Sequence, residues 1–528
     1  MIDGGMQPYA LTLDKFLDHA AKWHPHAEVI TAVGGGAVQR VGYAGLRERA
    51  GRVSALLAGL GVSRGDRVAT LAWNTQAHME AWYGIMGMGA ACHTLNPRVT
   101  AEQSAAMLEQ SGALVVVVSV DLLPLARTIL ALAPSVARVL VIDGVPADGE
   151  GPPCCSMSVL DPDQAAPGAE LVWGDFDENT ASGLCFTSGT TGAPKGVVYS
   201  HRSGYLHTLR LLQADVVGLT AADTVLAAVP MFHANAWGLP FAAPAVGARL
   251  VLPGRHLDGA SLAGLIAEQG VTVAAGVPTV WLGLLNHIEA HGGELPSLKR
   301  LMVGGAPMSE ALMARLEQRL GVTVQTSWGM TELSPLGTIT PPDDPGRQAA
   351  WAGRPAMGVD LRLTDEHGEP LAEQRDREGH LWVRGASVVG RYLGHDQPAT
   401  DDQGWFATGD LARIDGHGNL IITGRAKDLI KSGGEWINPG EIEAIVGALA
   451  SVSQAAVIGR ADARWGERPL LIVETNGAAL ADDQEILDAL RGRVASWWLP
   501  DAVIRVPAMP LAATGKIDKM RLRSEYGQ

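Results

Sequence analysis

The sequence has little cysteine and no excess of positive charge, and each shortage excludes a class of protein. Its 528 residues include four cysteines: Cys92, Cys154, Cys155 and Cys185. None is spaced as CxxC, so a zinc ribbon or redox dithiol is not expected, and we predict reduced thiols in a cytoplasmic protein. The formal net charge of −15 argues against nucleic acid as a partner. It still allows a small anionic ligand held by backbone amides.

The chain also lacks the signals that membrane proteins carry. The N-terminus has no basic start followed by an apolar stretch, so no signal peptide is expected. Residues 225–248 contain no Asp, Glu, Lys or Arg and could span a bilayer by length. However, Pro230, Pro240 and Pro244 would break a spanning helix. We therefore predict no transmembrane segment here but a buried strand followed by interior loops, which form the wall of a pocket.

Hydrophobic residues make up 47% of the chain, enough for a large core. Up to about residue 330, β-branched runs alternate with helical patterns, which predicts an α/β fold of parallel or mixed sheets covered by helices. A β-rich subdomain is expected at about 350–426, within an N-terminal domain of 1–426, and a small mobile α+β domain at 427–528. Strands are predicted at 67–73, 113–120, 138–143, 224–229, 271–275, 300–303, 455–458 and 470–474, and helices at 43–60, 439–449 and 482–498.

The strongest chemical signal is the loop TSGTTGAPKG at 187–196, which follows an apolar run. Its glycines let the backbone approach a ligand, and its hydroxyls with Lys195 suit phosphate oxygens. The alternative is a plain surface loop, but such loops rarely run into PKG. The loop is not a Walker A motif, because Pro194 stands directly before the Lys and no Ser or Thr follows it.

Two further patterns predict no chemistry. Residues 61–65 match GxSxG, but that hydrolase motif lies between a strand and a following helix, whereas a helix precedes this one. His287 and His291 could share a helix face as metal ligands, but no third ligand is evident. We expect a turn at the first and a surface helix at the second.

The loop at 187–196 resembles the signature loop of the adenylate-forming superfamily, which includes acyl-CoA synthetases, luciferases and peptide-synthetase adenylation domains. Further motifs of that superfamily follow in order: WGMTE at 328–332, TGD at 408–410, GRAKD at 424–428 with IKSGGEWINPGEIE at 430–443, and PLAATGKIDK at 510–519. The resemblance covers nearly the whole chain, and five motifs in order are highly specific. Trp328 replaces the commoner Tyr, but it also offers a flat ring.

The resemblance implies that a carboxylate and ATP give acyl-AMP, whose acyl group then passes to a thiol. Thr331 would donate to the α-phosphate, and Glu332 would hold Mg²⁺, a hard ion that prefers oxygen. Asp410 and Arg425 would hold the ribose. The full set implied for ATP or AMP is Thr187, Ser188, Gly189, Thr190, Thr191, Gly192, Lys195, Gly305, Ala306, Pro307, Ser327, Trp328, Gly329, Met330, Thr331, Asp410, Ile422, Arg425 and Lys516.

The resemblance also implies two poses of the C-terminal domain, with a hinge at Lys427. In the first pose, Lys516 bridges the carboxylate and the α-phosphate; without the PLAATGK pattern, a surface Lys would be the simpler interpretation. In the second, a CoA channel replaces it, formed by Lys431, Ser432, Gly433, Gly434 and Trp436. From the sequence alone, a simple turn at the two glycines explains them equally well.

The acyl site is expected around FHANAWG at 232–238. His233 would lie near the carbonyl and act with Lys516, Thr331 and Glu332 in catalysis, although a neutral core His is an alternative. Family position implies these pocket residues: His233, Trp237, Val277, Thr279, Trp281, Gly304, Gly329 and Met330. No acidic residue neighbours His233 to pair a buried ammonium, and the bulk of Trp237 indicates a short or medium acid.

The sequence therefore predicts a cytoplasmic AMP-forming acid–thiol ligase that uses ATP, Mg²⁺ and coenzyme A. It resembles the branch with medium-chain fatty-acyl-CoA synthetases and 3-methylthiopropionate-CoA ligases, and the acid stays open between fatty acids, 3-methylthiopropionate and aryl-alkanoates. The rivals are an acyl-AMP ligase that loads a carrier protein and a non-catalytic nucleotide-binding protein. Retention of Glu332, Asp410, Arg425 and Lys516 speaks against the second. A homodimer is compatible with the sequence, and a luciferase-type side activity stays open.

Overall fold

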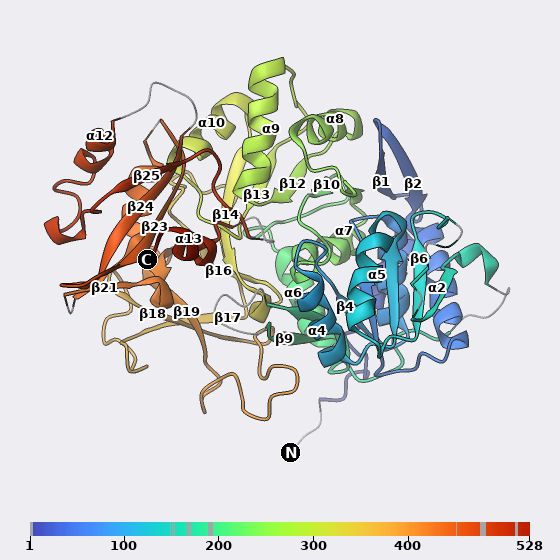
Figure 1. Ribbon diagram of the computed structural model, residues 1–528. Coiled ribbons are helices and arrows are strands. Elements are labelled where there is room, and N and C mark those ends of the chain that lie inside the picture. Colours follow the sequence, from blue (N-terminus) through green and yellow to red (C-terminus); the bar gives the residue numbers. More distant parts are fainter. Residues whose placement is uncertain are drawn as a thin grey trace.

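Two large sheets, built mainly from parallel strands, make up the N-terminal part of the molecule (Figure 1). The computed structural model describes residues 4–147, 149, 151–152, 154–165, 171–187, 194–433, 435–449, 451–475, 482–512 and 516–527. The first sheet has the strand order β7-β6-β5-β3-β4-β8-β9, and its last pair is antiparallel. Its strands are β3 (Arg67–Leu71), β4 (Ala91–Thr94), β5 (Val115–Ser119), β6 (Arg138–Ile142), β7 (Ser156–Val159), β8 (Ala181–Phe186) and β9 (Gly196–Ser200).

The second sheet has nine strands in the order β16-β15-β14-β13-β12-β10-β11-β1-β2, parallel from β14 to β1. Its strands are β1 (Glu28–Gly34), β2 (Ala37–Gly42), β10 (Thr224–Ala227), β11 (Arg249–Leu252), β12 (Val273–Gly276), β13 (Arg300–Val303), β14 (Thr323–Gly329), β15 (Leu336–Ile339) and β16 (Arg354–Pro355). Its central strands β10 and β12 are fully buried and mainly apolar, as parallel strands covered on both faces must be.

Helices fill the space between these two sheets and cover their outer faces. They are α1 (Asp14–Trp23), α2 (Tyr43–Gly59), α3 (Gln76–Gly87), α4 (Ala101–Ser111), α5 (Leu123–Leu132), α6 (His201–Leu211), α7 (Leu239–Val246), α8 (Gly259–Gln269), α9 (Pro278–His291) and α10 (Glu310–Leu320). Helix α3 is buried on nearly all sides, and most of its buried residues are apolar. Trp82 of α3 stacks on Phe241 of α7, with ring centroids 5.8 Å apart.

A four-stranded antiparallel sheet and a C-terminal unit follow, coloured orange to red in Figure 1. The four-stranded sheet contains β17 (Val359–Thr364), β18 (Glu378–Gly385), β19 (Phe406–Ile414) and β20 (Leu420–Arg425). The C-terminal unit contains β21 (Ile430–Ser432), β22 (Glu435–Ile437), β23 (Val452–Asp462), β24 (Gly466–Thr475) and β25 (Val503–Val506), with α11 (Pro439–Gly447), α12 (Asp483–Asp488) and α13 (Lys519–Tyr526). Its apolar side chains form clusters of their own, separate from those of the large sheets.

The predicted α/β fold, with its β-rich sheet and C-terminal α+β unit, is confirmed, and every predicted strand is present. One predicted helix is wrong: of residues 482–498, the helix α12 takes only Asp483–Asp488. The chain turns at Gly492, whose φ of 73° is one that glycine adopts without strain. The loops expected after β10 are also partly wrong, because residues 239–246 form α7.

Pro240 lies in the first turn of α7, where its missing N–H has no intrahelical partner to lose. Pro244 lies inside the same helix, which ends two residues later. The three prolines therefore shorten the helical part of residues 225–248 rather than remove it. Among the residues that the structure describes, none of the helices combines the length and apolar character that a membrane crossing requires.

Candidate functional site

The candidate site lies where the carboxyl ends of β13 and β14 meet the β8–β9 connection, the four-stranded sheet and the C-terminal unit. Strands β13 and β14 are parallel neighbours, so the residues that follow them, 304–307 and 330–332, lie at one edge of the sheet. Ligands of open α/β sheets bind at this edge. In Figure 1 the red chain near α13 reaches the middle of the molecule, close to β14.

Residues Thr331 and Glu332 form the short helix η4 (Thr331–Leu333) directly after β14. Both residues are buried, and their main chain is fixed from two sides. The Tyr199 hydroxyl donates to the Thr331 carbonyl at 2.8 Å, and the Val389 amide donates to the Glu332 carbonyl at 2.7 Å. The Tyr392 hydroxyl donates to Glu332 Oε1 at 3.0 Å. The site therefore holds a carboxylate of defined direction.

Burial raises the pKa of Glu332, while the hydrogen bond from Tyr392 and the charges of Arg425 and Lys195 lower it. A buried carboxylate beside cations, with hard oxygen atoms, fits Mg²⁺ that is shared with phosphate groups. The chemistry of this residue thus agrees with the metal that the sequence predicts.

Asp410, in β19, is the best-anchored charge of the site. Trp328 Nε1 donates to its Oδ2 at 2.9 Å, and Arg425 Nε donates to its Oδ1 at 2.7 Å. A carboxylate has about four acceptor positions, so two remain for the hydroxyls of a ribose. Trp328 itself is only 8% exposed and packs against Gly337. Its indole acts as a donor to Asp410 here, and its stacking on adenine stays a prediction.

Lys516 enters this group of charges from the C-terminal unit. The pKa of its ammonium is lowered by the protein atoms around it and by the charge of Arg425, while Asp410 and Glu332 raise it. The side chain keeps access to solvent. The hairpin that carries it is closed by the Ala512 amide, which donates to the Lys516 carbonyl at 2.7 Å. Lys516 is thereby brought near Asp410 and Glu332, which precede it by about 100 and 180 positions in the sequence.

His233 lies close to the same lysine. Burial, followed by the charges of Lys516 and Arg98, lowers the pKa of His233 to about 4, so its imidazole is neutral at pH 7. The next four residues, Ala234 to Trp237, all have φ between 43° and 55°. This left-handed turn without glycine costs roughly 1–2 kcal/mol per residue, and such strain is commonly found at functional sites.

The acyl-pocket candidates lie partly together. A Cβ built on Gly304 would lie 3.2 Å from the Trp237 ring, and one on Gly305 would lie 3.3 Å from Val277. Trp237 thus crosses the backbone that follows β13. Thr279, Gly329 and Met330 are half-buried. Trp281 of α9, in contrast, is fully buried in the core, and its indole donates to the Gly276 carbonyl, so it presents no surface to a ligand.

The β8–β9 connection holds the phosphate-loop candidates. The Thr187 amide donates to the Lys195 carbonyl at 2.9 Å, which closes the base of the loop. Lys195 Nζ lies over the Tyr392 ring, 4.9 Å from its centroid. Ser188, Gly189, Thr190, Thr191 and Gly192 lie outside the described residues.

The other nucleotide candidates lie after β13, on β14 and on β20. Ser327 Oγ donates to the Val303 carbonyl at 3.0 Å, and Ile422 packs with the cluster that contains Trp328. Ala306 and Gly305 are half-buried, and Pro307 is exposed. These candidates thus come from three parts of the fold, and their shared role in binding a nucleotide stays a prediction.

The CoA-channel candidates lie on β21 and β22 of the C-terminal unit. Lys431 Nζ lies 5.2 Å from the centroid of the exposed Trp436 ring. A Cβ on Gly433 would lie 2.8 Å from the Trp465 ring, and Gly433 has φ of 61°, so glycine is required there by its neighbour as well as by the turn. Ser432 is buried, and Gly434 lies outside the described residues.

The hinge candidate Lys427 lies in the short helix η5 (Ala426–Asp428), between β20 and the C-terminal unit. Its neighbour Asp428 pairs with Arg523 of α13 at 3.1 Å. Lys427 therefore lies at the crossing from one unit to the other, and its role as the hinge stays a prediction.

Sequence reasoning missed Tyr392, Tyr199 and Arg98. Tyr392 and Tyr199 contact residues 331–332 through hydrogen bonds, and Arg98 lies close enough to lower the pKa of His233. None has a spacing that marks it as functional, because each reaches the site only through the tertiary fold.

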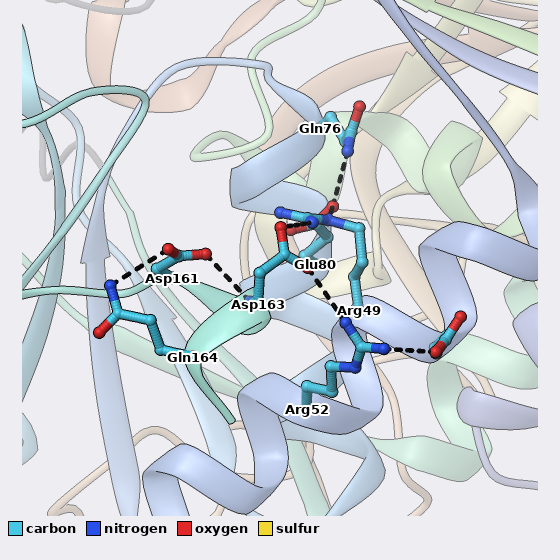
Figure 2. Close-up of polar contacts among 8 residues, drawn as sticks. Arg49, Arg52, Gln76, Glu80, Asp161, Asp163 and Gln164 are labelled. Carbon is cyan, nitrogen blue, oxygen red and sulfur yellow. Dashed lines mark hydrogen bonds and ion pairs between the residues drawn. The ribbon is translucent and has the colours of Figure 1, made fainter. Parts of the chain in front are cut away.

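A cavity of about 560 Å³ lies away from this site, between α2, α3 and the end of β6. Figure 2 shows polar contacts along it. Arg49 Nε donates to Glu80 at 2.7 Å and Arg49 Nη1 to Asp163 at 2.9 Å, while Gln76 also donates to Glu80 at 2.7 Å. These contacts join α2, α3 and the short helix η2 (Pro162–Gln164), so the charged side chains here hold the three helices together.

Comparison with known proteins gives a consistent result. The family described as "AMP-binding enzyme" matches residues 17–393, and its C-terminal domain matches residues 441–516. A 3-methylmercaptopropionyl-CoA ligase of Ruegeria pomeroyi is 40% identical, over 99% of this chain and 98% of that protein. A medium-chain-fatty-acid–CoA ligase of Ectopseudomonas oleovorans is also 40% identical, over 99% and 97%.

A solved structure shares both the fold and the extent of the chain. ATP-bound MatB from Rhodopseudomonas palustris superposes with a TM-score of 0.85 at 27% identity, covering 98% of this chain and 99% of that one. The C-terminal unit is thus part of the shared architecture and no addition to it.

Proposed function

Because the chain belongs to the family of AMP-binding enzymes and is an AMP-forming acid–thiol ligase that uses ATP, Mg²⁺ and coenzyme A, we propose that it converts a short- or medium-chain carboxylic acid to its CoA thioester. The observation that supports the site assignment is that Arg425, Asp410 and Glu332 of the N-terminal part lie near enough to Lys516 for their charges to shift its pKa. The first half-reaction requires a cation at this place.

In the first half-reaction, the carboxylate attacks the α-phosphate of ATP, and pyrophosphate leaves. Two anions must approach, so fixed positive charge at the α-phosphate lowers the barrier. Lys516 and the Thr331 N–H or hydroxyl would supply it, while Asp410 and Arg425 hold the ribose and keep the nucleotide in line. Mg²⁺, bound beside Glu332, would screen the charge of the phosphates.

In the second half-reaction, the thiol of CoA attacks the acyl carbonyl, and AMP leaves. Lys516 must then withdraw, and we propose that the unit carrying β21 and β22 turns about Lys427 to bring Lys431 and Gly433 to the site. The neutral imidazole of His233, with its low pKa, would face the carbonyl without adding a charge. Separate poses would keep CoA away until acyl-AMP has formed.

The acid is proposed from the chemistry around Trp237. The neighbours of His233 are apolar or amide side chains, Phe232, Ala234 and Asn235, which suits an acyl chain without a charged amine. The Trp237 ring lies against the backbone at Gly304, so it limits the depth of the pocket. The two relatives named for 3-methylmercaptopropionate and for medium-chain fatty acids support acids of this size.

Replacement of Trp237 by Ala tests this assignment. Each methylene in an apolar pocket changes discrimination by about 1–3 kcal/mol, so we expect kcat/KM to shift by about tenfold or more toward longer acids. The measurement is kcat/KM over a series of straight-chain acids. Trp436→Ala, on the CoA side, is the matched control and should leave the chain-length order unchanged. An unchanged order in Trp237→Ala would place the acyl chain elsewhere.

We also propose that the enzyme acts in the cytoplasm, where ATP and CoA are available. Cys92, Cys154, Cys155 and Cys185 carry free thiols, which fits a reducing compartment. Cell fractionation with an antibody to the chain tests this. A homodimer stays a prediction, to be tested by light scattering on the purified protein.

A further inference from the structure

We infer that Tyr392 is a positioning residue for the polyphosphate end of the ATP site, because it links the Mg²⁺ carboxylate Glu332 to the phosphate-loop Lys195. The inference rests on the proposed role of Glu332. Neither the motifs nor the expected site residues include Tyr392, which lies in the connection between β18 and β19 of the β-rich sheet.

The first contact is made by the hydroxyl. Tyr392 Oη donates to Glu332 Oε1 at 3.0 Å, and Glu332 is only 8% exposed. The two methylenes of a glutamate allow several directions of its carboxylate, and one fixed donor selects among them. The remaining acceptor positions stay available to a metal ion. Partners of this kind, which hold a ligand without touching the metal, commonly change metal affinity by about 10–100-fold.

The second contact is made by the ring. Lys195 Nζ lies 4.9 Å from the Tyr392 centroid, within the range of a cation–π interaction. Lys195 is the last residue of the candidate phosphate loop before β9 begins. One aromatic side chain thus contacts both the carboxylate and the cation that are expected to bind the metal and the phosphates.

The main chain around Tyr392 makes this placement rigid. The Leu393 amide donates to the Gly196 carbonyl at 2.8 Å, and the Val389 amide donates to the Glu332 carbonyl at 2.7 Å. Tyr392 also forms a bridge with Val197 of β9. Residues 389–393 therefore connect the β-rich sheet both to the end of the phosphate loop and to η4. A site held by such a shell keeps its geometry within narrow limits.

The test is metal binding measured without turnover. Mn²⁺ replaces Mg²⁺ as the probe, and its binding to the protein is followed by electron paramagnetic resonance in the presence of α,β-methylene ATP, whose α–β bridge is not cleaved. Tyr392→Phe keeps the ring and removes the hydroxyl, so we expect Mn²⁺ affinity to fall by about tenfold. Tyr392→Leu removes both contacts and should weaken Mn²⁺ and the nucleotide analogue together.

Tyr43→Phe is the matched control, because it removes another buried hydroxyl, one that donates to the Ala248 carbonyl at 2.6 Å far from η4. It should leave Mn²⁺ affinity unchanged. Thermal unfolding of each variant confirms that it is folded. If Tyr392→Leu does not fold, Tyr392→Phe alone tests the positioning role.

Glu332→Gln distinguishes the positioning role of Tyr392 from the metal-binding role of Glu332. If Glu332→Gln weakens Mn²⁺ binding and Tyr392→Phe does not, the positioning role is wrong while the proposed function stands. If neither variant changes Mn²⁺ affinity, the role of Glu332 is wrong, and the inference falls with it. Weaker binding in both variants, with Tyr43→Phe unchanged, supports the inference.

Discussion

At the scale of single residues, the site is a balance of opposite charges around Lys516. The protein atoms around its ammonium and then the charge of Arg425 lower its pKa, and Asp410 and Glu332 raise it. Arg425 is itself paired with Asp410. Such a group places a cation near the expected anionic substrate without fixing it in one ion pair, which suits the withdrawal that we propose for Lys516 after the first half-reaction.

Replacement of Lys516 by Ala is expected to slow acyl-AMP formation by about 10²–10³-fold, the usual cost of one lost electrostatic contact to the transition state. Thioester formation from supplied acyl-AMP should continue. Lys431→Ala is the reciprocal control and should impair only the second step. The two half-reactions are measured separately by rapid quench. Equal losses in both steps for Lys516→Ala would contradict the two-pose mechanism.

The lowered pKa of Lys516 predicts a pH dependence of the first step. Adenylation needs the ammonium, which is lost as the pH rises through this pKa. The rate should therefore fall on the alkaline side, at a pH below the one at which an ordinary lysine loses its charge. In Lys516→Arg the cation persists at all accessible pH values, so the alkaline fall should disappear. A profile shared by both half-reactions would assign the fall to another group.

At the scale of elements, β20 and α11 touch where one unit passes into the other. A Cβ on Gly424 would lie 2.5 Å from Asn438, and one on Gly440 would lie 2.4 Å from the Thr423 carbonyl. Asn438 caps α11 by accepting from the Gly440 amide at 3.1 Å. Glycine on both sides thus permits the close approach that sets this orientation of the C-terminal unit.

Gly440→Ala should push α11 away from β20. Overpacking of this kind typically costs about 1–3 kcal/mol, so we expect a lower unfolding temperature, faster proteolysis near Lys427 and slower adenylation. Gly447→Ala, in the same helix, is the control because a Cβ there meets no atom within 4 Å, and Ala favours a helix. Normal adenylation and stability in Gly440→Ala would show that the contact does not set the orientation.

At the scale of the whole molecule, two units with separate cores form one site. Residues 430–522 fill their own apolar clusters, so this unit can move without disturbing the large sheets. The pair Asp428–Arg523 joins η5 to α13 at 3.1 Å on the hinge side. Separate cores of this kind suit the two positions that we propose for this unit during each turnover.

Much of this architecture could be predicted because short motifs and alternating patterns are local. The alternation of strand and helix patterns predicted the two large sheets. The motif residues Glu332, Asp410, Arg425 and Lys516 lie near one another in the structure. What could not be predicted depends on tertiary packing. Tyr392 reaches Glu332 from another sheet, and Trp281 is core although its position suggests a pocket wall. The helix expected at 482–498 failed because its apolar spacing continues through the turn at Gly492.

The most direct test of the central claim is AMP release from ATP and Mg²⁺ over a panel of carboxylic acids, with and without free CoA, with the products identified by mass spectrometry. The account predicts CoA-dependent AMP release, an acyl-CoA product and the highest kcat/KM for a short or medium acid. Acyl-AMP that accumulates while CoA stays unconsumed would contradict it, since the acceptor would then be another thiol, such as that of a carrier protein.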